Sequence, residues 1–131
     1  MKQTKQIIQT QEAPAAIGTY SQAVKTGNHV YISGQIPLRP DTMQMVEGDI
    51  KEHTQQVFKN LDAIAKAAGG SLADVVKLNV FLRDLTHFPI VNEVMAEFFQ
   101  QPYPARAVIG VSALPKDAVV EADAIMKLPD A

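Results

Sequence analysis

Cysteine is absent from the sequence, and so is any long apolar run. Without cysteine there can be no disulfide framework, no thiolate nucleophile and no metal site built on sulfur. No window approaches the ~20 apolar residues of a membrane-spanning helix, and the N-terminus has no apolar run of the length that a signal peptide needs. We therefore expect a soluble protein of the cytoplasm.

An excess of positive charge is also missing. Twelve Lys and Arg residues stand against fourteen Asp and Glu residues, which gives a formal net charge of -2. Because no global positive field attracts phosphate backbones, nucleic acid is not an expected partner.

Cofactor and metal motifs are missing as well. The sequence has no phosphate-binding loop, no dinucleotide-binding glycine fingerprint and no GxSxG nucleophile motif. His29, His53 and His87 lie far apart and lack the spacing of metal ligands. We expect neither a cofactor nor a metal.

What is present fits one compact domain. The chain has 131 residues, of which 47% are hydrophobic and 20% are charged. This is the size and mixture of a single globular domain over residues 1–131. A chain of this length buries roughly two-thirds of the surface that its unfolded form exposes, which is enough to stabilise a core without disulfides.

Hydrophobic periodicity predicts five strands and two helices. In chain order they are a strand at 20–25, a strand at 29–36, a helix at 50–68, a strand at 76–83, a helix after Thr86, a strand at 105–111 and a strand at 119–126. In the strand at 76–83, Val76 belongs to the predicted apolar face.

Capping residues support the two helices. Asp49 and Glu52 have the spacing of a capping box at the start of the first helix, and the pair Gly69–Gly70 supplies its stop. Thr86 is the expected cap of the second helix.

This order of elements predicts an α+β fold, with a single mixed β-sheet and both helices packed on one face. The last strand has apolar residues on both sides, so the second face of the sheet is also partly apolar. Since such a face needs a partner, we predict a homo-oligomer.

Arg106 is the most informative polar residue. On a strand it shares its face with Val108 and Gly110, so its guanidinium is expected to point into an apolar surface and to need an anion. Two interpretations stay open. The anion is either a carboxylate from elsewhere in the fold or the carboxylate of a small ligand, held by two parallel hydrogen bonds.

Glu121 is an isolated acid in an otherwise apolar strand. It is either the structural partner of Arg106 or the wall of a cavity, where burial raises its pKa and suits it to proton transfer. Gly34, in the strand at 29–36, marks a bulge or the close approach of a ligand to the backbone. Tyr20 is either a core edge or the lid of a pocket.

Several separated motifs resemble the RidA (YjgF) family of reactive imine deaminases, in order and with compatible spacing over nearly the whole chain. They are APAAIGTYSQ at 13–22, SGQIP at 33–37, PAR at 104–106, LPKD at 114–117 and Glu121.

The resemblance implies a chorismate-mutase-like α+β fold, assembled as a homotrimer with sites in the clefts between subunits. It also implies hydrolysis of 2-imino acids such as 2-iminobutanoate and 2-iminopropanoate to 2-oxo acids and ammonia, without cofactor or metal. These substrates are released by pyridoxal-phosphate-dependent dehydratases.

The resemblance also assigns roles to residues. Arg106 is expected to bind the substrate carboxylate, and Glu121 to position or deprotonate the attacking water. The residues expected to line the substrate site are Tyr20, Ser33, Gly34, Phe88, Asn92 and Val108.

Two positions depart from the family pattern. Val108 stands where many members have cysteine, so no thiol-dependent behaviour is expected there. Ala122 stands where isoleucine or methionine is common, and its smaller side chain predicts looser packing.

Two other classes of function compete with the deaminase. The same pocket suits a non-enzymatic module that binds small carboxylates such as 2-oxo acids or protects proteins. Ribonuclease or translation-inhibitor activity, ascribed to some relatives, is disfavoured by the acidic charge balance.

Overall fold

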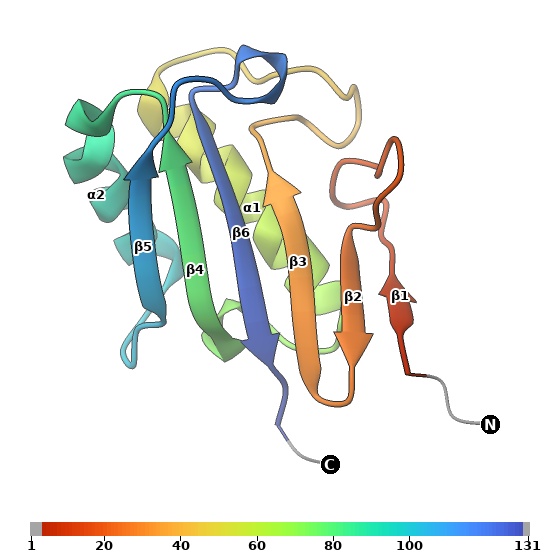
Figure 1. Cartoon of the computed structure of the whole chain (residues 1–131). Helices are drawn as coiled ribbons and strands as arrows, with labels where there is room; N and C mark the ends of the chain where they lie inside the picture. The colour runs from red at the N-terminus through yellow and green to blue at the C-terminus, as the bar shows by residue number, and fades with distance from the viewer. Residues whose placement is uncertain (1–3, 130–131) are drawn as a thin grey trace.

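The computed structural model describes residues 4–129. Its strands form one six-stranded sheet in the order β1-β2-β3-β6-β4-β5, seen face-on in Figure 1. The elements are β1 (Gln6–Ile8), β2 (Ala23–Thr26), β3 (His29–Gln35), α1 (Ile50–Ala67), β4 (Val75–Leu82), α2 (Phe88–Phe98), β5 (Ala105–Gly110) and β6 (Val120–Lys127).

The sheet is mixed, as predicted. All neighbouring strands are antiparallel except β4 and β5, which are parallel and are joined through α2. β6, the last strand, lies in the middle of the sheet, whereas β5 lies at its edge. The chain therefore places its last two strands in very different surroundings.

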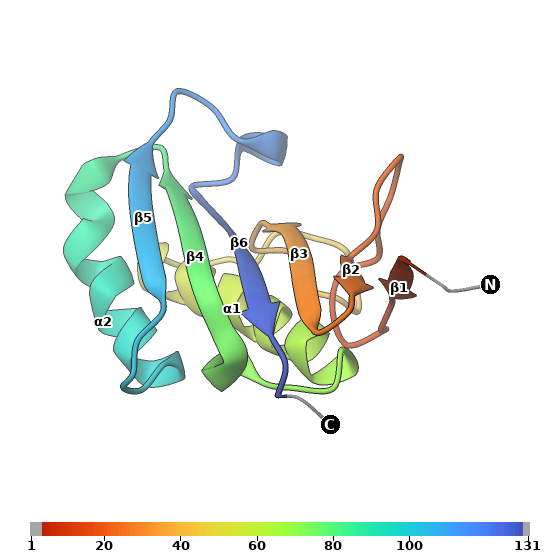
Figure 2. The same cartoon turned by 60° about the horizontal axis from the view of Figure 1, so that its bottom comes forward.

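Both helices cover the same face of the sheet, which confirms the predicted α+β layering. Figures 1 and 2 show α1 behind the middle of the sheet and α2 towards the β5 edge. Large apolar side chains from the two layers fill the space between them and are fully buried, among them Phe58, Leu61, Ile64, Leu78, Val80, Leu82, Val91 and Val94. Among residues 4–129, no α-helix covers the opposite face of the sheet.

The first helix begins at residue 50 as predicted and ends at Ala67, one residue before the predicted end. Asp49 caps it, and a reciprocal capping box joins Asp49 and Glu52. Gly69, just beyond its end, adopts a φ of 100°, a left-handed conformation that glycine takes without strain.

The cap predicted for the second helix was wrong. A short 3-10 helix, Leu85–His87, precedes α2, and Thr86 lies inside it. Asp84 caps this short helix, since its carboxylate accepts hydrogen bonds from the Thr86 N–H and the Thr86 hydroxyl. The N-cap of α2 itself is His87, which makes no side-chain capping hydrogen bond.

The position of Val76 also differs from the prediction. Val75 is buried and Val76 is 47% exposed, because the register between β4 and β6 shifts between Val75 and Lys77. A single irregularity of this kind moves a side chain to the other face of a strand. The later apolar residues of β4 face the core as predicted.

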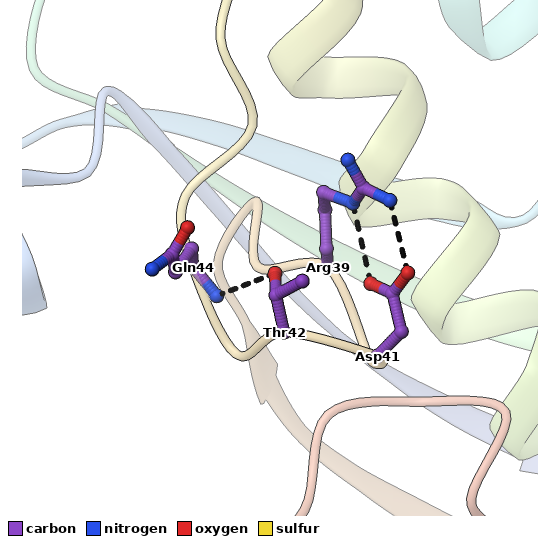
Figure 3. A network of polar contacts seen from close by, with 4 residues as sticks. All are labelled: Arg39, Asp41, Thr42 and Gln44. Atoms are coloured by element: carbon purple, nitrogen blue, oxygen red, sulfur yellow. Dashed lines mark hydrogen bonds and ion pairs between the residues drawn. The ribbon is translucent and has the colours of Figure 1, made fainter.

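A loop at 36–48 joins β3 to α1 at the top of Figure 1. In Figure 3, Arg39 donates two hydrogen bonds to the Asp41 carboxylate, and the backbone N–H of Gln44 donates to the Thr42 hydroxyl. These contacts are local to the loop. Between residues 4 and 129, no helix combines the length and apolar character needed to cross a membrane.

Candidate functional site

Arg106 lies in β5 and contacts three side chains of α2. Its Nη1 donates to Asn92 Oδ1 over 2.8 Å and lies 3.4 Å from Met95 Sδ. Its guanidinium carbon lies 5.1 Å from the centroid of the Phe88 ring, within the range of a cation–π contact. These contacts orient the guanidinium but leave its positive charge unneutralised.

No carboxylate pairs with Arg106 in the part of the chain that the structure describes, since none of the ion pairs among residues 4–129 includes it. The expectation that Arg106 points into a buried surface was wrong. The residue is exposed because β5 is the edge strand of the sheet that residues 4–129 form. Within one chain, the guanidinium is available to an external anion.

Val108 lies two residues further along β5 and is half-buried. Together with Leu85, Phe88 and Arg106 it lines a hollow of about 390 Å³. We call the four predicted residues of this region, Phe88, Asn92, Arg106 and Val108, the cation half-site.

Glu121 lies in the central strand β6, half-buried and against Gly34 of β3. A Cβ atom at Gly34 would overlap the Glu121 carboxylate, so the carboxylate fits only because this residue is glycine. Burial raises the pKa of the Glu121 carboxyl above its ordinary value, and the negative charge of Asp123 raises it further.

A bulge brings Gly34 to this position. The register between β3 and β6 shifts over the stretch that contains Ser33 and Gly34, as the isolated glycine predicted. The Ser33 hydroxyl donates to the carbonyl of Ser21 over 2.5 Å, and the Ser33 N–H donates to the carbonyl of Gln22 over 2.9 Å. Ser33 therefore ties the bulge to the segment that follows Tyr20.

Tyr20 covers a hollow and does not belong to the core. Its side chain is 52% exposed, and its hydroxyl accepts a hydrogen bond from the Ile17 N–H over 3.2 Å. Tyr20, Gly34 and Glu121 line a hollow of about 380 Å³. We call Tyr20, Ser33, Gly34 and Glu121 the acid half-site.

The two half-sites lie on opposite faces of the sheet. Arg106 pairs with Leu78 of β4, and Glu121 pairs with Phe81 of the same strand. Paired residues on neighbouring strands point to the same side, and successive residues alternate. Since Leu78 faces the helices, Arg106 lies on the helix face and Glu121 on the open face.

Glu121 is therefore not the structural partner of Arg106 in the same chain. Of the two interpretations that the sequence left open for Glu121, the structure favours the cavity wall. The predicted residues come together in two groups, with β4 between their strands. One chain alone does not bring the guanidinium and the carboxylate to a single substrate.

Three neighbours of these groups were not predicted from the sequence as site residues. Met95 and Tyr103 line a further hollow of about 430 Å³ together with Arg106, and Lys116 lines the hollow of Glu121. Met95 follows Asn92 at helical spacing, which is the signal that places both on one face of α2. Among residues 4–129, no cluster of His, Asp and Glu that could hold a metal ion is present.

Comparison with known proteins gives a consistent result. A family model described as Endoribonuclease L-PSP matches residues 10–127. A 2-iminobutanoate/2-iminopropanoate deaminase of Dermatophagoides farinae is 51% identical over 122 residues, which cover 93% of this chain and 95% of the relative.

Solved structures share the fold at high identity. RidA from the Antarctic bacterium Psychrobacter sp. PAMC 21119 is 57% identical with a TM-score of 0.91, over 94% of this chain and 99% of that one. E. coli TdcF, solved with bound serine, is 42% identical with a TM-score of 0.90, over 95% of this chain and 99% of that one.

Proposed function

The chain belongs to the RidA (YjgF) family, whose model is described as Endoribonuclease L-PSP, and from this we propose that it hydrolyses 2-iminobutanoate and 2-iminopropanoate to 2-oxo acids and ammonia. The unpaired guanidinium of Arg106 is the observation that carries the proposal. Three relatives named for this activity are 46–51% identical to the chain. The proposal includes the single domain over residues 1–131 and the cytoplasmic location that the sequence predicts.

Arg106 binds the substrate carboxylate in this proposal. The carboxylate is the permanent anionic group of a 2-imino acid, and a guanidinium grips it with two parallel hydrogen bonds. Asn92 and Phe88 hold the guanidinium in place, so little orientation has to be acquired when substrate binds. That E. coli TdcF was solved with bound serine, also a small carboxylate, supports this role.

Glu121 activates the water. Its raised pKa makes it a stronger base than an ordinary glutamate. It accepts a proton as the water oxygen attacks the carbon of the protonated C=NH2+ group, which gives a neutral carbinolamine. It returns that proton to nitrogen, and it accepts the hydroxyl proton as the C–N bond breaks and the C=O bond of the 2-oxo acid forms. The departing ammonia takes up this proton as ammonium, which restores the carboxylate.

The complete site lies between subunits. Arg106 and Glu121 are on opposite faces of one sheet, so a single substrate meets both only if a second copy supplies one of them. The edge position of β5 and the uncovered sheet face favour such an assembly. We propose a homotrimer in which the cation half-site of one copy faces the acid half-site of the next.

The test uses two inactive variants. Arg106→Ala and Glu121→Gln each should abolish the acceleration of ammonia release from freshly generated 2-iminobutanoate. In trimers formed at random from equal amounts of both, each site draws Arg106 and Glu121 from different copies. About a quarter of the sites then regain both native residues, and about a quarter of the wild-type activity returns.

The mixture also has its own controls. Each variant, taken alone through the same mixing step, must stay inactive. Light scattering of the mixed protein must give three times the mass of one chain. No recovery in mixed trimers would place both residues in the same copy and overturn the inter-subunit site. Unchanged activity of Arg106→Ala would overturn the deaminase.

Two simple measurements test the two alternative functions. Tight binding of 2-oxobutanoate without turnover of the imine would assign a non-enzymatic carboxylate-binding module. RNA cleavage or salt-dependent binding of single-stranded RNA would assign the activity in the family description. The net charge of -2 disfavours it.

A further inference from the structure

Gln22 is the most heavily hydrogen-bonded buried side chain near the acid half-site. It lies immediately before β2 and is 3% exposed. Its Nε2 is within hydrogen-bond distance of the carbonyl oxygens of Thr10, Ala13 and Pro14, at 3.0, 3.3 and 2.8 Å. Its Oε1 accepts a hydrogen bond from the Thr10 N–H over 2.7 Å.

Only an amide side chain suits this set of partners. Two amide hydrogens are shared among three carbonyl oxygens, while the amide oxygen takes the one N–H. A carboxylate would direct negative charge at three carbonyls, and an apolar side chain would leave buried backbone groups unpaired. The backbone at 10–14 thus depends on the identity of this one residue.

The segment at 10–20 is also a wall of the acid half-site. Pro14, Ala15, Ile17 and Tyr20 line the hollow that contains Glu121. The two largest of these side chains are poorly packed within the chain, Ile17 being 69% exposed and Tyr20 52% exposed. Their position rests on the backbone that carries them and not on their own contacts with the core.

Gln22 is coupled to the other side of the hollow as well. Its backbone carbonyl accepts the Ser33 N–H, and the neighbouring carbonyl of Ser21 accepts the Ser33 hydroxyl. Ser33 precedes Gly34, against which the Glu121 carboxylate lies. One residue therefore joins the exposed outer wall at 10–20 to the bulge against which the Glu121 carboxylate lies.

We propose that Gln22 is a positioning residue: its buried side-chain amide holds the segment at 10–20 as the substrate-binding wall of the acid half-site. The kinetic part of this inference rests on the proposed deaminase activity. Gln22 does not touch the substrate. It acts through Tyr20 and the backbone at 14–17, so its loss weakens substrate binding more than it slows the chemical step.

The test compares Gln22→Met with Gln9→Met in the whole chain. Both substitutions exchange an amide for an apolar side chain of similar length, but Gln9 is an exposed residue that precedes the segment at 10–20. For Gln22→Met we expect KM for 2-iminobutanoate to rise about tenfold with kcat within about twofold of wild type. Gln9→Met should leave both constants unchanged.

Hydrogen exchange gives a readout that needs no activity. The Ile17 N–H is bonded to the Tyr20 hydroxyl and not to Gln22, so it reports the position of the wall. In Gln22→Met its protection should fall about tenfold, while amides of β4 and β6 stay protected. Gln22→Glu should regain protection as the pH falls, because a neutral carboxyl again offers one donor and one acceptor.

The outcomes separate the two hypotheses. Native exchange at 10–20 in Gln22→Met overturns the positioning role, and so does a fall in kcat with unchanged KM, which is the sign of a partly unfolded enzyme. A wild-type protein without deaminase activity overturns the proposed function alone. The exchange comparison then still decides the role of Gln22.

Discussion

Arg106 and Glu121 carry opposite charges on opposite faces of one sheet, and the structure holds them in different ways. In the cation half-site, side chains of α2 contact the guanidinium directly through a hydrogen bond to Asn92 and the ring of Phe88. In the acid half-site, the carboxylate occupies space that the missing side chain of Gly34 leaves open.

The two residues are held differently because their strands occupy different positions in the sheet. β5 is an edge strand, so water reaches Arg106 and solvates its charge. The side chains that contact the guanidinium can therefore all be neutral. β6 lies mid-sheet, so Glu121 is half-buried and its pKa is raised. A half-buried acid with a raised pKa can take up a proton from water and release it again. The positions thus suit one residue for binding and the other for proton transfer.

Removing the acid should have the largest effect on turnover. For Glu121→Gln we expect kcat to fall by about 10² to 10⁴, because the amide cannot take a proton from water. In the wild type, activity should drop as the pH falls through a pKa above the ordinary 4.5, where the base becomes protonated. Steady-state rates across pH test this, and an acid limb that persists in Glu121→Gln would refute it.

Changing the cation should affect binding more than turnover. Arg106→Lys keeps the charge but loses the planar fork that matches a carboxylate. We expect KM for 2-iminobutanoate to rise about a hundredfold. The matched control is Arg83→Lys, an exposed arginine outside both half-sites, which should behave as wild type. Equal effects of the two substitutions would remove the special role of Arg106.

Filling the space at Gly34 should disturb the acid half-site alone. The added methyl group of Gly34→Ala must displace the Glu121 carboxylate, so kcat should fall about tenfold while binding at the cation half-site is kept. Isothermal titration with 2-oxobutanoate separates the two effects. Loss of oxo-acid binding with normal turnover would reverse the assignment of the half-sites.

The smallest effect is expected in the loop of Figure 3. The Arg39–Asp41 ion pair is exposed on both sides, and water screens such pairs. Arg39→Ala should leave kcat and KM unchanged and lower the melting temperature by no more than a few degrees, as measured by calorimetry. A large loss of activity would extend the acid half-site into this loop.

Much of the fold was predictable because local signals agreed. The capping box at Asp49 and Glu52, the glycine stop and the alternation in β4 each reflect physics within a few residues. The predictions failed where contacts between distant parts of the chain determine the structure. The register shift near Val76 depends on pairing with β6, and the short strand β1 forms only because β2 offers an edge to it.

The candidate site was predictable in its members but not in its geometry. Arg106, Glu121 and Gly34 stand out as polar or small residues in apolar strands. The face of the sheet on which each of these residues lies depends on the order of the strands, which no local sequence pattern encodes. The hydrogen bonds of Gln22 to residues 10–14 could not be predicted from local patterns either, because the partners of Gln22 lie 8 to 12 positions away.

By itself, the sequence determined which residues are charged, which face of the first helix is apolar, the alternation of β4 beyond Val76, and where the first helix begins. These follow from side-chain chemistry and backbone periods of a few residues. Only the tertiary structure decided that Arg106 and Glu121 lie on opposite faces, because that required placing β4 between β5 and β6. Strand order is fixed by the packing of the whole sheet against its two helices.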